Sequence, residues 1–189
     1  GEADAVSGAK SVRMLGLDGA YVQMLTEGIP TLRGLAITYG LNYIPGPWMD
    51  AIAITKGSGS VINGYDPITG QINVEYIKPE KSDRLYLNLY ANHVGRWEGN
   101  LNLAHRFNDQ WSTMALLHVS GLNTAVDHND DHFLDMPKYG LFSGIQRWKY
   151  QGEKLESMFG VKVLSENRTG GQVSYNSKLP RTIDNGYGI

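Results

Sequence analysis

The stretch DRLYLNLYANHVGRWEGNLNLAHRF, residues 83–107, alternates apolar and polar side chains almost without a break. Successive side chains of an extended chain point to opposite faces, so this alternation predicts two β-strands, at 83–92 and 97–107. In the first strand, one face carries Leu85, Leu87, Leu89 and Ala91, and the other carries Tyr86, Asn88, Tyr90 and Asn92. A similar but less regular alternation predicts three further strands, at 111–120, 139–150 and 154–166.

The connections between these strands differ in length. FND (107–109) and YQGEK (150–154) are short, whereas NTAVDHNDDHFLDMP (123–137) is long. Strands of about ten residues, with short turns at one end and long loops at the other, are typical of a transmembrane β-barrel. A soluble antiparallel sheet with one solvated face alternates in the same way, so the pattern alone leaves both architectures open.

The composition narrows the possible functions. The chain has 189 residues, enough for one domain or parts of two, and its net charge of −2 gives no field that favours nucleic acid. The absence of cysteine excludes disulfides, thiolate metal sites and a cysteine nucleophile. No apolar run approaches the roughly 20 residues of a membrane-spanning helix, and the first residues lack the pattern of a signal peptide. No catalytic triad stands out, so we expect no enzymatic activity.

The first third of the chain mixes strand and turn signals. Two short apolar stretches, Val12–Leu17 and Tyr21–Leu25, flank an Asp18-Gly19 turn signal and predict a β-hairpin. A short helical turn is expected near Pro47-Trp48, and Ile52–Thr55 is a predicted strand. The glycine-rich stretch at 57–70 lacks the Gly-Lys-Ser/Thr ending of a phosphate loop, so a series of turns is favoured there.

Three segments in this region resemble the plug domain of TonB-dependent outer-membrane receptors. AIAITKGSGSVINGYDPITGQINVEYIKP (51–79) is similar to the end of the plug, LTEGIPTLRG (25–34) to its "iDGvPl" element, and LNYIPGPWMDAIAITKG (41–57) to its "ierIEVlkG" element. The sequence departs from the family at Gln71, where a glycine is usual, at Asn63, where a tyrosine is usual, and at Glu27, where an aspartate is usual.

The resemblance implies a mostly β fold in which residues 1–79 form the C-terminal part of a plug domain. Residues 80–189 would then form the first five or six antiparallel strands of a transmembrane β-barrel, and the chain would be a fragment of a larger receptor. Such a receptor lies in the outer membrane of a Gram-negative bacterium and takes up a scarce nutrient, such as a metal chelate or cobalamin. Its partners would be the outer-membrane lipid, a small-molecule ligand and TonB, which would bind a segment ahead of this one; nucleic acid is not expected. A soluble, β-rich, calcium-dependent ligand- or carbohydrate-binding module is the alternative.

The acidic stretch DHNDDHFLD, residues 127–135, is the strongest chemical signal. Asp127, Asn129, Asp131 and Asp135 place oxygen ligands at alternating positions, which suits Ca²⁺. The spacing follows the first part of an EF-hand loop, but His132 replaces the turn glycine and Lys138 replaces the terminal acid. A solvated acidic loop without bound metal would have the same composition, so both interpretations stay open.

Two further sets of residues follow from the resemblance and from general membrane-protein chemistry. In the family, the plug loop that corresponds to TLRGLAITYG (31–40) faces the bound substrate, which implies Arg33 and Tyr39 as substrate contacts. Tryptophans collect at the water interfaces of membrane proteins. The four tryptophans are therefore candidates either for such a belt or for a core: Trp48, Trp97, Trp111 and Trp148.

Overall fold

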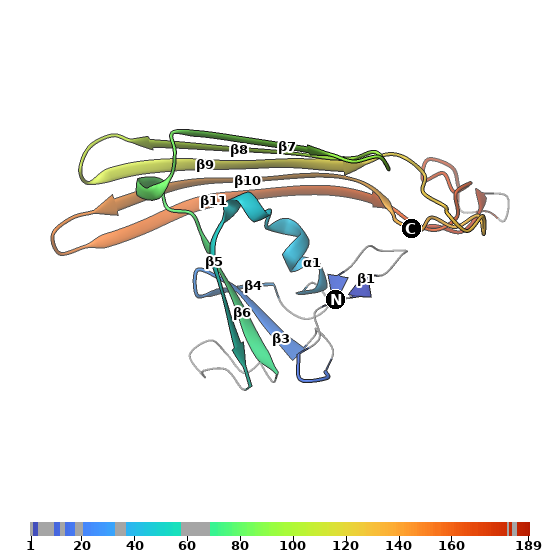
Figure 1. Cartoon of the computed structure of the whole chain (residues 1–189), viewed down its shortest axis with the longest axis horizontal. Coiled ribbons are helices and arrows are strands. Elements are labelled where there is room, and N and C mark those ends of the chain that lie inside the picture. Colours follow the sequence, from blue (N-terminus) through green and yellow to red (C-terminus); the bar gives the residue numbers. More distant parts are fainter. Residues whose placement is uncertain are drawn as a thin grey trace.

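The structure is a computed structural model, and it describes residues 2–3, 10–11, 14–17, 21–32, 37–57, 69–180, 182 and 185–189. It is mostly β, as predicted. In Figure 1, a long, curved sheet lies above a smaller group of strands and short helices. We call these two parts the large sheet (β7–β11) and the small unit (the described residues before Lys78).

The large sheet consists of five antiparallel strands in the order β7-β8-β9-β10-β11. Its strands are β7 (Leu85–Ala91), β8 (Arg96–Arg106), β9 (Trp111–Leu122), β10 (Lys138–Gln151) and β11 (Glu156–Thr169). All five predicted strands are therefore confirmed, with ends that differ by a few residues. The short connections 107–110 and 152–155 define one end of the sheet, the short-turn end. The long loop 123–137 and the chain after Thr169 lie at the other end, the loop end (Figure 1).

The small unit contains a four-stranded sheet in the order β4-β3-β6-β5. Its strands are β3 (Val22–Thr26), β4 (Ile29–Leu32), β5 (Met49–Lys56) and β6 (Gly70–Tyr76). Strand β3 is parallel to β6, whereas the other two pairs are antiparallel. A separate pair joins β1 (Glu2–Ala3) to β2 (Lys10–Ser11). The predicted strand at Ile52–Thr55 is confirmed within β5.

The predicted hairpin around Asp18-Gly19 is wrong in its pairing. Val22–Thr26 is a strand, but its hairpin partner is β4, and its turn is formed by Glu27 (φ 54°) and Gly28 (φ 76°). Two positive φ angles in succession are typical of a type I′ turn, whose twist matches that of the flanking strands. The Asp18-Gly19 pair lies outside the described residues, and Met14 forms an isolated bridge with Leu17.

Short helical segments connect the strands of the small unit. They are α1 (Ile37–Gly40), η3 (Leu41–Tyr43) and η4 (Gly46–Trp48), and η4 confirms the helical turn predicted at Pro47-Trp48. A further short helix, η6 (Pro79–Lys81), lies in the connection to the large sheet. In the part of the chain that the structure describes, no helix is long and apolar enough to cross a membrane.

One glycine of the glycine-rich stretch has a clear steric role. A Cβ atom at Gly70 would collide with the carbonyl oxygen of Thr55 on the neighbouring strand. A glycine is therefore needed where β6 begins beside β5. Most of the predicted series of turns, residues 58–68, lies outside the described residues.

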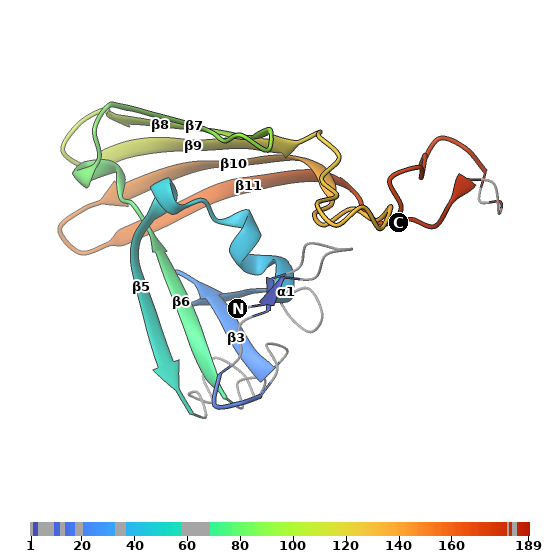
Figure 2. The ribbon, with the colours of Figure 1, turned by 45° about the vertical axis from the view of Figure 1, so that its right-hand side comes forward.

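The main core lies between the small unit and the concave face of the large sheet. Trp48 and Val74 of the small unit are fully buried in one cluster with Met114 and Leu116 of β9. Figure 2 shows that β5 and β6 run away from the large sheet, so the contact is made by their near ends and by the segment that carries η4. We call the concave, covered face of the large sheet its inner face and the opposite one its outer face.

Candidate functional site

The two faces of the large sheet have inverted polarity. On the inner face, Asn100 and Asn102 are exposed by only 1% and 2%. On the outer face of the same sheet, Leu87 is exposed by 62% and Leu103 by 41%. A sheet that folds in water buries its apolar face and leaves its polar face solvated, because burial of apolar surface drives folding. In this sheet the covered face carries buried polar side chains beside the apolar core residues Met114 and Leu116, and the open face is largely apolar.

Aromatic side chains border the outer face near both ends of the strands. At the short-turn end, three pairs have ring centroids 4.8–5.3 Å apart: His105 with Phe107, Trp111 with Tyr150, and Trp148 with Phe159. Towards the loop end, the indole of Trp97 lies against Gly121, where an added Cβ would come within 2.9 Å of the ring. Trp48 is the exception among the tryptophans, because it is a core residue of the small unit.

The centre of the inner face is a hydrogen-bonded polar cluster beneath the small unit. A ring nitrogen of His118 lies 2.8 Å from the side-chain oxygen of Asn100, and the other lies 3.1 Å from Ser120 Oγ. The Asn102 amide donates to the carbonyl of Pro47 in the small unit over 3.1 Å. The ring of Trp48 meets that of His118 edge to face at 6.4 Å. The polar wall of the sheet is thus matched to polar and aromatic groups of the small unit.

Arg147 joins the two parts near the short-turn end. Its side chain is only 4% exposed, and its guanidinium donates to Glu27 over 2.6 Å and to the carbonyl of Ile77 over 3.3 Å. It also lies over the ring of Tyr76 at 5.6 Å. Lys78 donates to the same Glu27 carboxylate over 2.6 Å. A buried charge is tolerated only when it is paired and hydrogen-bonded, and these contacts satisfy that condition.

A second group of charges lies beside Arg147 and faces the connection between the two parts. Lys149 pairs with Glu80 of η6 and, over 3.0 Å, with Glu156 of β11. Burial by itself raises the pKa of Glu80, but the hydrogen bond from Lys149 and the charges of Lys149 and Lys78 outweigh it, so the net shift of this pKa is downward. The short-turn end therefore holds the small unit through Arg147 and the connection that follows the small unit through Lys149.

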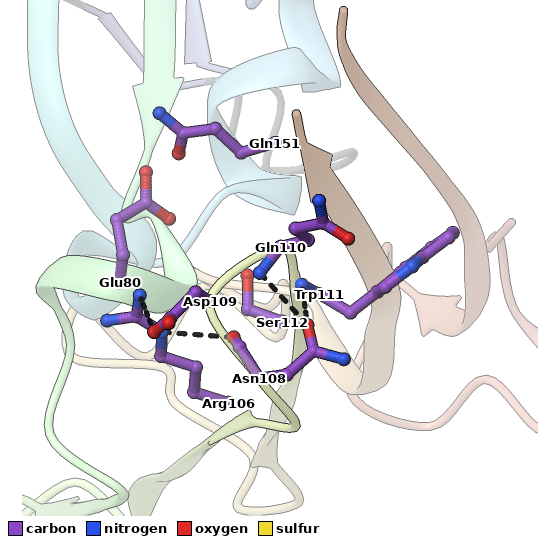
Figure 3. A pocket seen from close by; sticks show the side chains of 8 residues that line it. All are labelled: Glu80, Arg106, Asn108, Asp109, Gln110, Trp111, Ser112 and Gln151. Carbon is purple, nitrogen blue, oxygen red and sulfur yellow. Dashed lines mark hydrogen bonds and ion pairs between the residues drawn. The ribbon is translucent and has the colours of Figure 1, made fainter. Parts of the chain in front are cut away.

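A cleft of about 200 Å³ opens next to these charges, at the turn between β8 and β9 (Figure 3). Several of its polar groups are bonded within the turn itself. Arg106 donates to Asp109 over 3.1 Å, and Asn108 Oδ1 accepts from the backbone amides of Gln110 and Trp111. An asparagine that accepts from the amides two and three residues later stabilises a tight turn, as expected for FND. We assign this cleft a structural role in the turn.

Tyrosine and charged side chains gather at the loop end of the inner face. The hydroxyl of Tyr43 in η3 donates to Glu166 of β11 over 2.8 Å. The guanidinium of Arg168 pairs with the same carboxylate and lies 5.8 Å from the ring of Tyr39 and 5.5 Å from that of Tyr139. Partial burial, followed by the hydrogen bond to Glu166 and its negative charge, raises the pKa of Tyr43 to about 12.

Of the two predicted substrate contacts, Tyr39 therefore lies in this loop-end cluster, whereas Arg33 lies outside the described residues. Sequence reasoning missed Tyr43, Glu166 and Arg168. The parity of β11 could have indicated the last two, because both are charged and occupy the face opposite to Phe159, Val161 and Val163. Tyr43 in η3, the partner of Glu166, is 123 residues away in the sequence, and no local pattern indicates this pairing.

The predicted calcium ligands all lie in the 127–135 loop, where their side chains form hydrogen bonds within the loop itself. Asp127 accepts from the amides of Asp131 and His132, and Asp131 accepts from the Phe133 amide and the Asn129 side chain. These bonds hold His132 at φ 67°, at the position where an EF-hand has its glycine.

Asp135, the last of the four, lies slightly apart. It accepts from both the amide and the ring of His128, and these two bonds hold the pKa of its carboxyl below its ordinary value. Within the described ranges, no group of three or more His, Asp or Glu side chains is arranged to hold a metal ion. Calcium binding by this loop stays a prediction.

The comparisons with known proteins support the fold only. No protein-family model and no curated protein matches the chain. Among solved structures, the chain is similar to the pyoverdine outer membrane receptor FpvA from Pseudomonas aeruginosa PAO1 bound to pyoverdine. The TM-score is 0.59 at 15% identity, and the match covers 90% of this chain and 25% of the receptor. The chain therefore shares a mostly β fold with about a quarter of an outer-membrane receptor.

Proposed function

We propose that the chain is part of a TonB-dependent outer-membrane receptor, in which the small unit is the end of the plug and the large sheet is the first part of the barrel wall. The observation that carries this proposal is the inverted polarity of the large sheet. Lipid tails accept the exposed leucines of the outer face without cost, whereas water does not. A wet lumen with a plug domain in it accounts for the buried asparagines of the inner face.

The dimensions of the outer face fit a bilayer. From Trp97 to Phe107, β8 and the start of its turn advance ten residues, or roughly 33 Å at the usual rise of a strand. At a tilt of about 40°, this length spans roughly 25 Å along the membrane normal, the height of the apolar band of outer-membrane barrels. The aromatic residues near both ends of this band fit its two interfaces with water.

In this proposal the receptor binds and transports its ligand and carries out no covalent chemistry. The loop end faces the cell exterior, and the small-molecule ligand meets the tyrosine and arginine side chains of the loop-end cluster. Tyr39 and Arg168 suit a ligand with planar or anionic groups, because guanidinium binds anions and stacks on rings. TonB acts on a plug segment that precedes this chain. Outer-membrane lipid surrounds the outer face.

The soluble binding module is the alternative, and the burial pattern argues against it. Such a module would expose to water the outer-face leucines of three neighbouring strands, an apolar patch that promotes aggregation. Its calcium dependence would rest on the 127–135 loop, which is stabilised by its own hydrogen bonds. We propose calcium as an additional ligand of that loop only within the receptor, where it would stiffen the loop end.

Membrane extraction of the full-length gene product, expressed in a Gram-negative host, tests the proposed function. We expect the protein in the outer-membrane fraction, resistant to washes with high salt and alkaline carbonate and released only by detergent. A periplasmic soluble protein expressed in the same cells is the control for incomplete lysis. Recovery of the folded protein in the wash without detergent would contradict the proposal and favour the soluble module.

A further inference from the structure

Three buried polar groups at the centre of the inner face have no hydrogen-bond partner among the residues that the structure describes. They are the indole Nε1 of Trp48, the side-chain oxygen of Asn102 and the hydroxyl of Ser143, on side chains no more than 2% exposed. An unbonded polar group is costly in a protein interior, so native proteins bond such groups to other residues or to ordered water. We propose that at least two internal water molecules lie between the small unit and the large sheet and bond these three groups.

The three groups surround one side chain, His118 of β9. Ser143 of β10 lies directly opposite His118, and Asn102 lies two residues along β8 from Asn100, which faces His118 from the other side. The ring of Trp48 meets that of His118 edge to face at 6.4 Å. The strands of Asn102 and Ser143 are separated by β9, which places the two residues roughly 10 Å or more apart at the usual strand spacing. One water cannot bond both, so at least two are needed.

The chemistry of the three groups selects water as the occupant. An indole N–H only donates, an amide oxygen only accepts, and a hydroxyl does both. The amide nitrogen of Asn102 donates to the carbonyl of Pro47 over 3.1 Å, which identifies the remaining atom as the oxygen. A metal cation would face the N–H of Trp48 with the wrong polarity, and an anion would face the oxygen of Asn102 with the wrong polarity. Water donates to one and accepts from the other.

The polar side chains next to the site are bonded to one another. The ring nitrogens of His118 lie 2.8 Å from the side-chain oxygen of Asn100 and 3.1 Å from Ser120 Oγ. The amide of Asn100 donates in turn to the side-chain oxygen of Asn88 over 3.2 Å. Because both ring nitrogens of His118 have these partners, the ring leaves the hydroxyl of Ser143 without a bond across the strand pair. Water is the remaining partner for that hydroxyl.

The proposed waters affect how the small unit is held on the sheet. Asn102 bonds Pro47 directly, whereas the indole N–H of Trp48 would reach the sheet through water. Bonds through an ordered water are nearly as favourable as direct ones. The centre of the interface would therefore be fully hydrogen-bonded although the side chains of its two sides do not reach each other directly.

Ser143→Ala tests the proposal through the sign of its effect. We expect the folding equilibrium constant of the full-length protein in phosphatidylcholine vesicles, measured by urea unfolding, to fall roughly three- to tenfold, because a bond to water is lost. A hydroxyl without any partner would give the opposite result, since its removal relieves a buried unbonded group. Ser120→Ala is the matched control, because that buried hydroxyl lies beside His118 and its loss should lower the constant. A constant at or above the wild-type value for Ser143→Ala would overturn the proposal.

A crystal structure of the full-length protein, at a resolution that shows ordered water, is the second measurement. We expect water oxygens within about 2.7–3.2 Å of Trp48 Nε1, Asn102 Oδ1 and Ser143 Oγ. Any one of these atoms without a water in the wild type would overturn the proposal. A protein that needs detergent but lacks these waters contradicts this inference alone, whereas a protein released without detergent contradicts the proposed function.

Discussion

Leu87→Arg distinguishes a lipid-facing outer face from a water-facing one. Leu87 is 62% exposed and pairs with Leu101 of β8, four residues from Trp97. Four residues correspond to roughly 13 Å along the strand, or roughly 10 Å along the normal of a membrane at a tilt of about 40°. The residue thus lies well inside the proposed apolar band.

The expected cost follows from this position. An arginine near the middle of the bilayer on the outside of a barrel costs about 2–4 kcal/mol. That corresponds to a change of roughly 30- to 1000-fold in the unfolding equilibrium, since 1.4 kcal/mol is a factor of about ten. If the outer face were in water, the same change at an exposed leucine would stay within about 0.5 kcal/mol.

The assay is equilibrium unfolding by urea of the full-length receptor in phosphatidylcholine vesicles, followed by tryptophan fluorescence. Leu179→Arg is the matched control, because Leu179 is 54% exposed in the chain after β11 and lies outside the large sheet. We expect the control to be close to wild type. If both variants lost the same amount of stability, to within about 0.5 kcal/mol, the reasoning from inverted polarity would be refuted.

Three further predictions concern the ends of the sheet. The phenol of Tyr43 stabilises the fold fully below pH 10, and this contribution is lost as the pH rises towards about 12. A titration followed by absorbance at 295 nm should therefore show one tyrosine ionising near pH 12, and this step should be absent in Tyr43→Phe. Arg147→Met should lower the free energy of unfolding by about 2 kcal/mol, less than the roughly 3–5 kcal/mol of a fully buried pair, because Glu27 keeps Lys78 as a partner. The control Arg106→Met removes an exposed pair and should cost under about 1 kcal/mol. If urea unfolding showed similar losses for both variants, the buried cation would have no special role. If calcium binds the acidic loop, calorimetry should detect heat of binding at millimolar Ca²⁺ in the wild type and none in Asp131→Ala. Equal heats for the two proteins would contradict calcium binding by this loop.

The fold of the large sheet could be predicted because its strands repeat a period-two pattern and join neighbours in sequence. Alternation at Leu85–Ala91 assigns each side chain to one of two faces, and it does so correctly. It gives no information on which face is covered, because that depends on the small unit and on the medium around the sheet. The burial of Asn100 therefore appears only in the structure.

The small unit was harder to predict because its key pairings are distant in sequence. The hairpin prediction used the nearest turn signal, yet β3 pairs with β6, where Gln23 and Gln71 share a buried hydrogen bond across 48 residues. Arg147 and Glu27 are 120 residues apart, and the sequence around either residue does not indicate the other as its partner. Tyr39 of α1 became a candidate site residue through the family resemblance alone.

The parallel pairing of β3 with β6 also has a consequence for the order of events during folding. Except across the long loop 123–137, each strand of the large sheet can register against the strand before it through a short connection, which costs little loop-closure entropy. Strand β3 must instead wait until Gly70–Tyr76 has been synthesised and has reached it. During that interval the apolar side chains of Val22, Met24 and Leu25 have no permanent cover, and exposed strands of this kind aggregate readily. We therefore expect the β3 segment to need temporary cover during folding until residues 70–76 have reached it.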